Sequence, residues 1–260
     1  MKHVILDDLK PVMDGTPIFA DLEFATPWSR FAFTVLPASG TFTARGEDIP
    51  CEQGYLVLGG PAELRAGSPA SPPVFTARHD GAQGVFLGPV GCDHEVTNLG
   101  ERSVRLVHVR VDLEQIPADS CTIAGEIDLD LLQWRDSIHG GTGRIATRHI
   151  WGSDQFASSW TFMDHAVLGP ESSLGYHYHD ALEECFLILA GSGYMTIADR
   201  TFVVAPGSVT FQEIQEGHGI YNPGPENLEF LRIAVAQPGE EYTTIDLHDD
   251  LSGRRPAEGG

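Results

Sequence analysis

Three histidines and a glutamate in the second half of the chain have the residue types and the spacing of a metal site. His177 and His179 are two residues apart, so on a β-strand both side chains would lie on one face. Glu184 follows on the next apolar run, and His218 follows another hairpin. Three neutral imidazoles and one carboxylate suit a divalent transition metal such as Fe, Mn, Ni or Zn. They also leave coordination positions open for water or substrate, as a catalytic site requires.

Two further residues are candidates for proton transfer near this cluster. Glu213 stands at the start of the strand leading to His218 and would act as a general base if burial raised its pKa; an exposed surface acid is the alternative. His165 lies on the strand before the cluster and would shuttle protons if it pointed into the barrel mouth. The alternative for His165 is an ordinary hydrogen-bonded histidine. Arg232 flanks the same strands and could orient a substrate carboxylate.

Six other histidines have no ligand spacing, and we expect them to be surface or structural residues: His3, His79, His108, His139, His149 and His248.

The elements that must position the cluster are strands. Alternating apolar runs recur along the chain, separated by turn clusters at the spacing typical of sandwiches and barrels. The 29 glycines and 17 prolines agree with many turns. Only the segment 127–137, near the midpoint, has helical spacing, through Leu129, Leu132 and Trp134. We therefore predict an all-β protein with a short helical or turn-like connector between its halves.

The two halves of the chain repeat each other. At one constant offset, Glu52 aligns with Glu184, and the apolar runs around both agree. At a second offset, shorter by the length of an insertion, His94 aligns with His218. This self-similarity predicts two homologous barrels, spanning residues 1–120 and 121–260.

The second half resembles the cupin superfamily. The first motif of that superfamily is HxH, three or four residues, Glu, six residues and Gly, and His177, His179, Glu184 and Gly191 match it. Glu183 is a neighbouring alternative that fits a shorter spacing, but only Glu184 also satisfies the spacing to the glycine. The resemblance implies double-stranded β-helix (jelly-roll) barrels, two in tandem, and so a bicupin.

The second cupin motif is kept in part. Gly207, His218 and Asn222 hold their places, whereas Glu213 and Gln215 stand where the family usually has Pro and Gly. Carried over residue by residue, the resemblance implies that the three histidines and Glu184 are the four metal ligands.

The first half has kept the fold pattern without the ligands. Its HxH has become Arg45-x-Glu47, which leaves only Glu52 and His94 as possible ligands. An arginine would repel a metal, so we expect Arg45 to pair with Glu52 or Glu47 in a vacated pocket. The N-terminal barrel is therefore predicted to be metal-free and structural.

The resemblance leaves the reaction open, because cupins with this ligand set include several classes of enzyme and binding protein. We favour a metal-dependent enzyme on a small oxygen-rich molecule, of the dioxygenase-type oxidoreductase class. Alternatives are an isomerase, decarboxylase or lyase, or a non-catalytic, metal-stabilised protein that binds a small ligand. Phe186 and Ile188 would form an apolar wall beside Glu184.

The composition of the chain indicates which classes of binding partner are unfavourable. The 16 basic and 37 acidic residues give a formal net charge of −21, which would repel nucleic acid and anionic membranes. Neither a secretory leader nor a long apolar run is present in the sequence, so we expect a cytoplasmic protein. Both halves would present sheet edges, which favours a homodimer.

Overall fold

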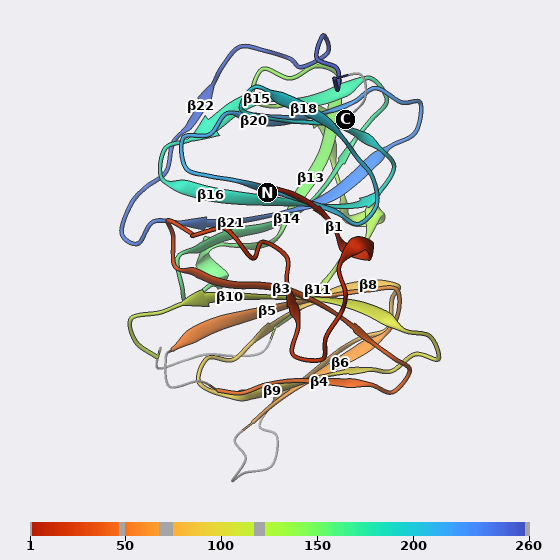
Figure 1. The fold of residues 1–260 in the computed structure, drawn as a ribbon, viewed down its shortest axis with the longest axis vertical. Coiled ribbons are helices and arrows are strands. Elements are labelled where there is room, and N and C mark those ends of the chain that lie inside the picture. The colour runs from red at the N-terminus through yellow and green to blue at the C-terminus, as the bar shows by residue number, and fades with distance from the viewer. Residues whose placement is uncertain (1, 47–49, 68–74, 117–122, 258–260) are drawn as a thin grey trace.

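The computed structural model describes residues 2–46, 50–67, 75–116 and 123–257. Over these residues the regular structure is β-sheet, with three short 3-10 turns, so the expected all-β class is confirmed. The turns are η1 (Leu6–Asp8), η2 (Leu129–Leu131) and η3 (Ser153–Gln155). The strands form four antiparallel sheets, arranged as two stacked barrels of two sheets each (Figure 1).

The N-terminal barrel has a six-stranded and a four-stranded sheet. In spatial order, the first contains β11 (Ile123–Glu126), β8 (Gln83–Gly88), β5 (Cys51–Leu58), β10 (Val104–Asp112), β3 (Trp28–Leu36) and β2 (Thr16–Pro17). The second contains β4 (Thr41–Ala44), β9 (Asp93–Asn98), β6 (Ala62–Gly67) and β7 (Phe75–His79).

The C-terminal barrel has a seven-stranded and a five-stranded sheet. In spatial order, the first contains β1 (His3–Ile5), β19 (Ser208–Gln212), β16 (Leu182–Ala190), β21 (Leu228–Ala236), β14 (Trp160–Leu168), β13 (Arg144–Gly152) and β12 (Trp134–Asp136). The second contains β18 (Arg200–Val204), β17 (Gly193–Ile197), β20 (His218–Asn222), β15 (Ser172–His179) and β22 (Thr244–Asp246).

Two edge strands lie on the barrel of the other half. β1, near the start of the chain, pairs with β19 at the edge of the C-terminal barrel's larger sheet (Figure 1). β11, which begins two residues after the expected domain boundary, pairs with β8 at the edge of the N-terminal barrel. The boundary expected between residues 120 and 121 lies outside the described residues. Each barrel thus has one sheet edge covered from beyond its own half, as edge protection requires.

The connector is less helical than its spacing predicts. Its only helical part is the single turn η2, in which the Asp128 side chain accepts a hydrogen bond from the backbone N–H of Asp130. Trp134 then begins β12, which pairs with β13. Leu129 and Trp134 are exposed, so no buried apolar face supports a longer helix here. Sheet pairing has overridden the helical pattern.

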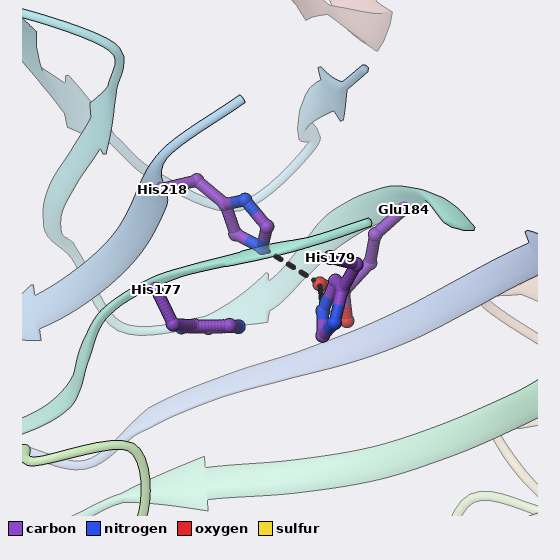
Figure 2. A group of neighbouring side chains, drawn as sticks. All are labelled: His177, His179, Glu184 and His218. Atoms are coloured by element: carbon purple, nitrogen blue, oxygen red, sulfur yellow. Dashed lines mark hydrogen bonds and ion pairs between the residues drawn. The ribbon is translucent and has the colours of Figure 1, made fainter. Parts of the chain in front are cut away.

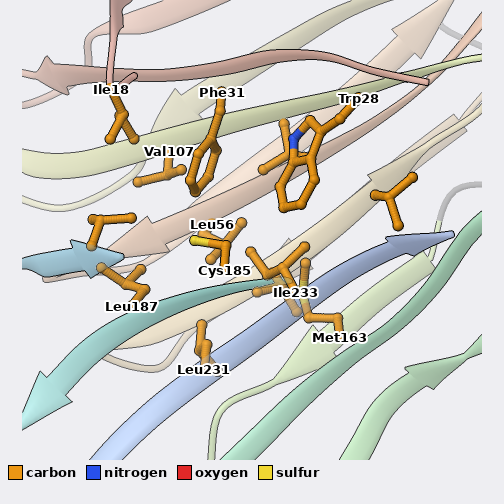
Figure 3. Packing of buried hydrophobic residues seen from close by; sticks show 14 of the residues in the cluster. Ile18, Trp28, Phe31, Leu56, Val107, Met163, Cys185, Leu187, Leu231 and Ile233 are labelled. Carbon is orange, nitrogen blue, oxygen red and sulfur yellow. The ribbon is translucent and has the colours of Figure 1, made fainter. Parts of the chain in front are cut away.

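The largest core cluster lies between the barrels. Leu56 and Val107 from the N-terminal barrel pack with Cys185, Leu187 and Leu231 from the C-terminal barrel (Figure 3). On the C-terminal side these residues are the odd-numbered positions of β16 and β21. The even-numbered positions of the same strands face the inside of their own barrel, where Phe186 and Ile188 belong to a second cluster.

The repeat is visible in matching hydrogen bonds. The Asn98 side-chain amide donates to the carbonyl oxygens of Leu36, Pro37 and Arg102, and the Asn222 amide makes the same three bonds one barrel later. Each asparagine oxygen also accepts from the glycine two residues on. The two asparagines therefore fix equivalent turns, as expected of Asn in loops.

Candidate metal centre

The structure brings the four predicted ligands together inside the C-terminal barrel. β15 carries His177 and His179, β16 carries Glu184, and β20 carries His218 (Figure 2). One ligand atom from each residue lies within 4.8 Å of the others, and all four side chains are buried. His177 is paired directly opposite His218, next to a β-bulge in β15 that follows Leu174. A bulge re-aims side chains at such sites.

Each histidine has one ring nitrogen held by the protein. The Nδ1 atom of His177 lies 2.7 Å from the Gly175 carbonyl oxygen, and that of His218 lies 2.8 Å from the Glu216 carbonyl oxygen. The Nδ1 atom of His179 lies 3.0 Å from the Thr244 hydroxyl on β22. A proton on Nδ1 leaves Nε2 as the free lone pair, which is the usual arrangement of a metal-ligating histidine.

The free nitrogens and the carboxylate converge. Within the described residues, the buried Nε2 atoms of His177 and His179 have no hydrogen-bond partner. Oε2 of Glu184 lies 2.9 Å from Nε2 of His218 and 3.4 Å from Nε2 of His179. Buried polar atoms without partners are rare in proteins, and here they point at a common centre. The donor set therefore fits a divalent transition metal.

Burial and neighbouring charges set the protonation states of the ligands. Desolvation lowers the pKa of His177 well below its ordinary value and also lowers that of His179. Burial alone would raise the pKa of the Glu184 carboxyl, but the charge of Arg232 and the close contacts with His179 and His218 outweigh it and hold that pKa well below the usual range. Neutral imidazoles and an ionised carboxylate are the forms that bind metals.

A buried arginine links the cluster to a second carboxylate. Nη1 of Arg232 lies 3.5 Å from Oε1 of Glu184, and Nη2 donates to Oδ2 of Asp164 at 2.6 Å. The guanidinium also lies over the Phe162 ring, 5.1 Å from its centroid. On the far side of Asp164, the neighbouring strand β13 supplies His149, whose Nδ1 contacts Oδ1. Sequence reasoning placed Arg232 near the site but missed its partner Asp164.

His139 also reaches the cluster, contrary to the expectation that it is a surface or structural residue. It belongs to the loop between β12 and β13, and its ring stacks on that of His177, with centroids 4.2 Å apart and planes at 28°. Desolvation, with the nearby charge of Arg232, lowers the pKa of His139 to about 4. No sequence spacing connects residue 139 to residue 177, so only the fold could reveal this contact.

Gln212 is a further interior residue that the sequence did not single out. It pairs directly opposite Glu184 on β19, so both side chains lie on the inner face of the sheet. Its amide nitrogen donates to the Thr210 hydroxyl at 2.9 Å. Among the described residues, its buried Oε1 has no hydrogen-bond partner.

The two predicted acid–base residues are not in the cluster. The Glu213 side chain is 47 % exposed and forms an ion pair with Lys2 at 3.0 Å, so it lies on the surface. Gln215 is exposed as well. His165 is buried, but it alternates with the inward-facing Asp164 on β14, and its Nε2 contacts Glu229 at 2.8 Å on the other face of the sheet. The expectation that Glu213 and His165 transfer protons at the cluster is therefore wrong.

Glu183, the neighbouring alternative ligand, does not face the cluster and instead forms hydrogen bonds to the N-terminal half of the chain. It faces the other barrel and accepts hydrogen bonds from the backbone N–H groups of Ala25 and Thr26, at 2.9 and 3.1 Å. It also accepts one from the Thr26 hydroxyl at 2.6 Å.

Glu52 makes the corresponding bonds from the N-terminal barrel, to the N–H groups of Ala157 and Ser158 and to the Ser158 hydroxyl. Glu52 thus corresponds in the fold to Glu183, so the sequence alignment with Glu184 is wrong by one residue. The expected pairing of Glu52 with Arg45 is also wrong, because Arg45 is exposed, while Glu47 lies outside the described residues.

The N-terminal barrel has hydrogen-bonded side chains where the C-terminal barrel has its cluster. Gln53, next to Glu52, contacts Nε2 of His108 at 2.8 Å. The Tyr55 hydroxyl contacts Nδ1 of His94 at 2.8 Å, and Nε2 of His94 lies 2.9 Å from the Pro89 carbonyl oxygen. His94 therefore has both ring nitrogens engaged, unlike His177 and His179, whose Nε2 atoms have no partner among the described residues.

Known proteins share this architecture. Residues 165–234, which contain the whole cluster, match the Cupin domain family. A Thermotoga maritima protein described as an oxalate-binding protein is 28 % identical over 99 residues, 38 % of this chain and 82 % of that protein.

Two solved structures match nearly the whole chain. An IolB-like protein from Salmonella typhimurium has a TM-score of 0.67 at 13 % identity, covering 95 % of this chain and 98 % of that one. Lactobacillus farciminis oxalate decarboxylase, in a formate complex, has a TM-score of 0.63 at 15 % identity, covering 95 % of this chain and 88 % of that one. Similarity at this level demonstrates a common fold.

No helix of the described residues is long and apolar enough to span a membrane.

Proposed function

Since the chain belongs to the cupin superfamily through its C-terminal barrel, we propose that it is a metal-dependent enzyme acting on a small carboxylate. One divalent transition metal would be held by His177, His179, Glu184 and His218. The observation that carries this proposal is the convergence of three Nε2 atoms on the Glu184 carboxylate while each Nδ1 is held by a carbonyl or hydroxyl oxygen.

The charges of the pocket favour an anionic substrate. Glu184 and Asp164 are acidic, Arg232 is basic, and desolvation favours the neutral forms of His177 and His179. The two carboxylates and the guanidinium leave one formal negative charge, and a divalent cation would convert it to one positive charge. A small carboxylate would neutralise that charge in a site that excludes water.

The chain's own residues would bind and orient such an anion. Phe186 lies beside the cluster, with its ring centroid 6.2 Å from that of His218, and gives the pocket an apolar wall. Arg232, fixed by Asp164, holds Glu184 in place and adds positive charge close to the metal position. Gln212 offers an acceptor oxygen on the same face as Glu184. When bound, the metal would supply Lewis acidity toward the carboxylate, and redox chemistry if it is iron or manganese.

The reaction class has two main candidates. A dioxygenase-type oxidation is suggested by the three-histidine, one-carboxylate donor set with open coordination positions. A decarboxylation is suggested by solved structures of the same fold that are titled oxalate decarboxylase. Among the described residues of the pocket, we find no feature that specifically favours an isomerase.

A non-catalytic binding protein is the second candidate function. It is favoured by the positions of Glu213 and His165, which leave the pocket without either of the acid–base groups expected from sequence. The Thermotoga maritima relative described as oxalate-binding agrees with this alternative.

The N-terminal barrel is proposed to be metal-free and structural. Gln53 stands where a carboxylate ligand would be needed, and both nitrogens of His94 are engaged by Tyr55 and Pro89. A homodimer and a cytoplasmic location stay predictions. Light scattering on the purified protein and fractionation of the source cells would test them.

The first experiment is elemental analysis of the purified protein, for wild type, for His177→Ala/His179→Ala, and for His94→Ala as the matched control in the other barrel. We expect one equivalent of metal per chain in wild type and in His94→Ala, and none in the double variant. Absence of metal from wild type after reconstitution with Mn, Fe, Ni and Zn would refute the proposal.

The second experiment assigns the reaction on the metal-loaded protein. Small carboxylates, with oxalate first, are tested for oxygen consumption and for carbon dioxide release. Oxygen consumption with turnover would identify an oxidase or dioxygenase, and carbon dioxide release without it would identify a decarboxylase. Saturable binding without turnover would establish the binding-protein alternative.

A further inference from the structure

The loop between β12 and β13 places a fifth histidine beside the four-residue cluster. The ring of His139 stacks on His177 and lies close enough to Glu184, His179 and His218 to be influenced by their charges. His177 is one of the four converging residues, so the His139 ring lies beside the cluster. The His139 side chain is half-buried, so it lies between the cluster and solvent.

The loop that carries His139 is fixed to the ligand-bearing strand. The Ile138 carbonyl accepts from the N–H of Gly175, and the Thr142 carbonyl accepts from the N–H of Ser173. In return, the Ser173 hydroxyl accepts from the N–H of Thr142. A Cβ atom on Gly175 would lie 1.9 Å from the His139 carbonyl oxygen, so the two backbones are in direct contact. The imidazole therefore has a defined position.

The backbone of His139 is also unusual. Its φ is 55°, in the left-handed region that few residues other than glycine adopt. Such conformations cost about 1–3 kcal/mol and persist where the surroundings over-determine them, often at functional sites. A glycine at position 139 would adopt the same φ at lower cost.

The ring is not one of the four converging ligands. The cluster whose ligand atoms lie within 4.8 Å of one another consists of the other three histidines and Glu184. The His139 ring thus lies beside the cluster, near the charged side chains of Arg232 and Glu184, and is partly exposed to solvent. These are the properties of a group that contacts a ligand rather than the metal.

We propose that His139 contacts the bound substrate, forming a hydrogen bond from its ring to the carboxylate held at the metal centre. This inference rests on the proposed function. The loop between β12 and β13 would then supply the residue that recognises the ligand, while strands of the same barrel supply the metal ligands.

The test uses the full-length, manganese-loaded protein with oxalate as the probe. His139→Ala removes the ring, and His139→Phe keeps a stacking ring without the nitrogens. His248→Ala is the matched control, because His248 has a φ of 59° and a side chain that is 88 % exposed. Metal content, oxalate Kd and the KM and kcat of any turnover are measured for each.

We expect all four proteins to hold one metal, and oxalate Kd to rise roughly 10- to 100-fold in both His139 variants, as loss of a hydrogen bond to a charged group implies. The control should bind like wild type. Unchanged oxalate binding in His139→Ala would overturn the inference, as would a normal Kd in His139→Phe, which would mean that only stacking matters. Loss of metal in the His139 variants alone would also overturn it, by giving His139 a purely structural role.

A second measurement is independent of the ligand. Manganese should broaden the ring NMR signals of His139 beyond detection and leave those of His79, on β7 of the N-terminal barrel, visible, because paramagnetic broadening depends steeply on distance. A His139 ring signal that stays visible in the manganese-loaded protein would place His139 away from the centre and overturn the inference. A wild-type protein that holds metal but binds no carboxylate would instead refute the ligand class of the proposed function, and the substrate contact would fall with it.

Discussion

Glu52 and Glu183 make the same three hydrogen bonds from opposite barrels. Each accepts two backbone N–H groups and one hydroxyl of a short loop on the other half, with matching distances of 2.9, 3.1 and 2.6 Å. The two loops repeat in sequence as Phe-Ala-Thr/Ser followed by Trp28 or Trp160. The contact between the barrels is therefore itself two-fold symmetric and is built from reciprocal carboxylate clamps.

The Glu183 clamp should contribute measurably to stability. Glu183→Gln keeps the shape but replaces one acceptor oxygen by a donor facing N–H groups, so we expect a loss of about 1.5–3 kcal/mol in the free energy of unfolding. Urea unfolding measures it. Glu101→Gln, at an exposed turn, is the control and should be neutral. Equal stability of the two variants would contradict the clamp.

Glu213 should be dispensable for the metal site. Its ion pair with Lys2 is exposed, so Glu213→Gln should cost less than about 1 kcal/mol in unfolding free energy and leave the metal content unchanged. Glu184→Gln, measured in parallel, should lose metal. A loss of metal or of ligand binding in Glu213→Gln would return Glu213 to the site.

A carboxylate alone should not restore a metal site in the N-terminal barrel. Gln53→Glu supplies the missing carboxyl group, but both ring nitrogens of His94 are engaged by Tyr55 and by the Pro89 carbonyl. Elemental analysis should therefore still give one metal per chain. Two equivalents would contradict the assignment of this barrel as structural.

The contact of the β12–β13 loop with β15 should be intolerant of a methyl group. In Gly175→Ala the new Cβ would meet the His139 carbonyl at 1.9 Å and the Gly141 nitrogen at 2.5 Å, so the loop must move. We expect a loss of roughly 1–3 kcal/mol in unfolding free energy. Gly253→Ala, which has nothing within 4 Å, is the control and should be neutral. Equal stability of the two would show that the loop is not fixed as described.

His149 should give the protein a pH-dependent increment of stability. The hydrogen bond with Asp164 raises the pKa of His149 above its ordinary value of 6.5, although burial and Arg232 oppose it. When the pKa of a histidine is higher in the folded than in the unfolded protein, its full stabilisation is present at a pH below the unfolded-state pKa. That stabilisation is lost as the pH rises through the folded-state pKa. The difference in unfolding free energy between wild type and His149→Gln should therefore be largest below about pH 6 and shrink at higher pH.

NMR titration of the His149 ring would follow the same group directly. Its pKa should drop in Asp164→Asn, and the exposed His248 serves as an internal reference. A His149 pKa that does not change in Asp164→Asn would contradict the assigned cause.

The sequence predicts the features that depend on local spacing. The HxH pair, Glu184 and His218 are linked by strand parity and hairpin lengths, so their convergence follows once the all-β pattern is recognised. Asp164 reaches the pocket through pairing of β14 with β21, and His139 reaches it through a loop contact with β15. Neither relationship has a fixed sequence separation, so no pattern in the chain could indicate it.

The acid–base assignments failed for a related reason. Glu213 holds a position of the second motif, yet it lies just before a turn. A side chain there is outside the strand, so the alternation of a strand does not hold it inward. His165 lies one residue from the inward-facing Asp164, and on a strand one residue is the difference between the inside of the barrel and its other face.

The exchange of β1 and β11 between halves has an evolutionary consequence. A gene for the C-terminal half alone would encode the metal ligands but would leave the edge of β19 bare and half of the shared core in water. Such a deletion would be selected against through solubility and folding rather than through loss of chemistry. An N-terminal barrel without metal ligands, as proposed above, would therefore persist, because the C-terminal barrel depends on it for a covered sheet edge and for half of the shared core.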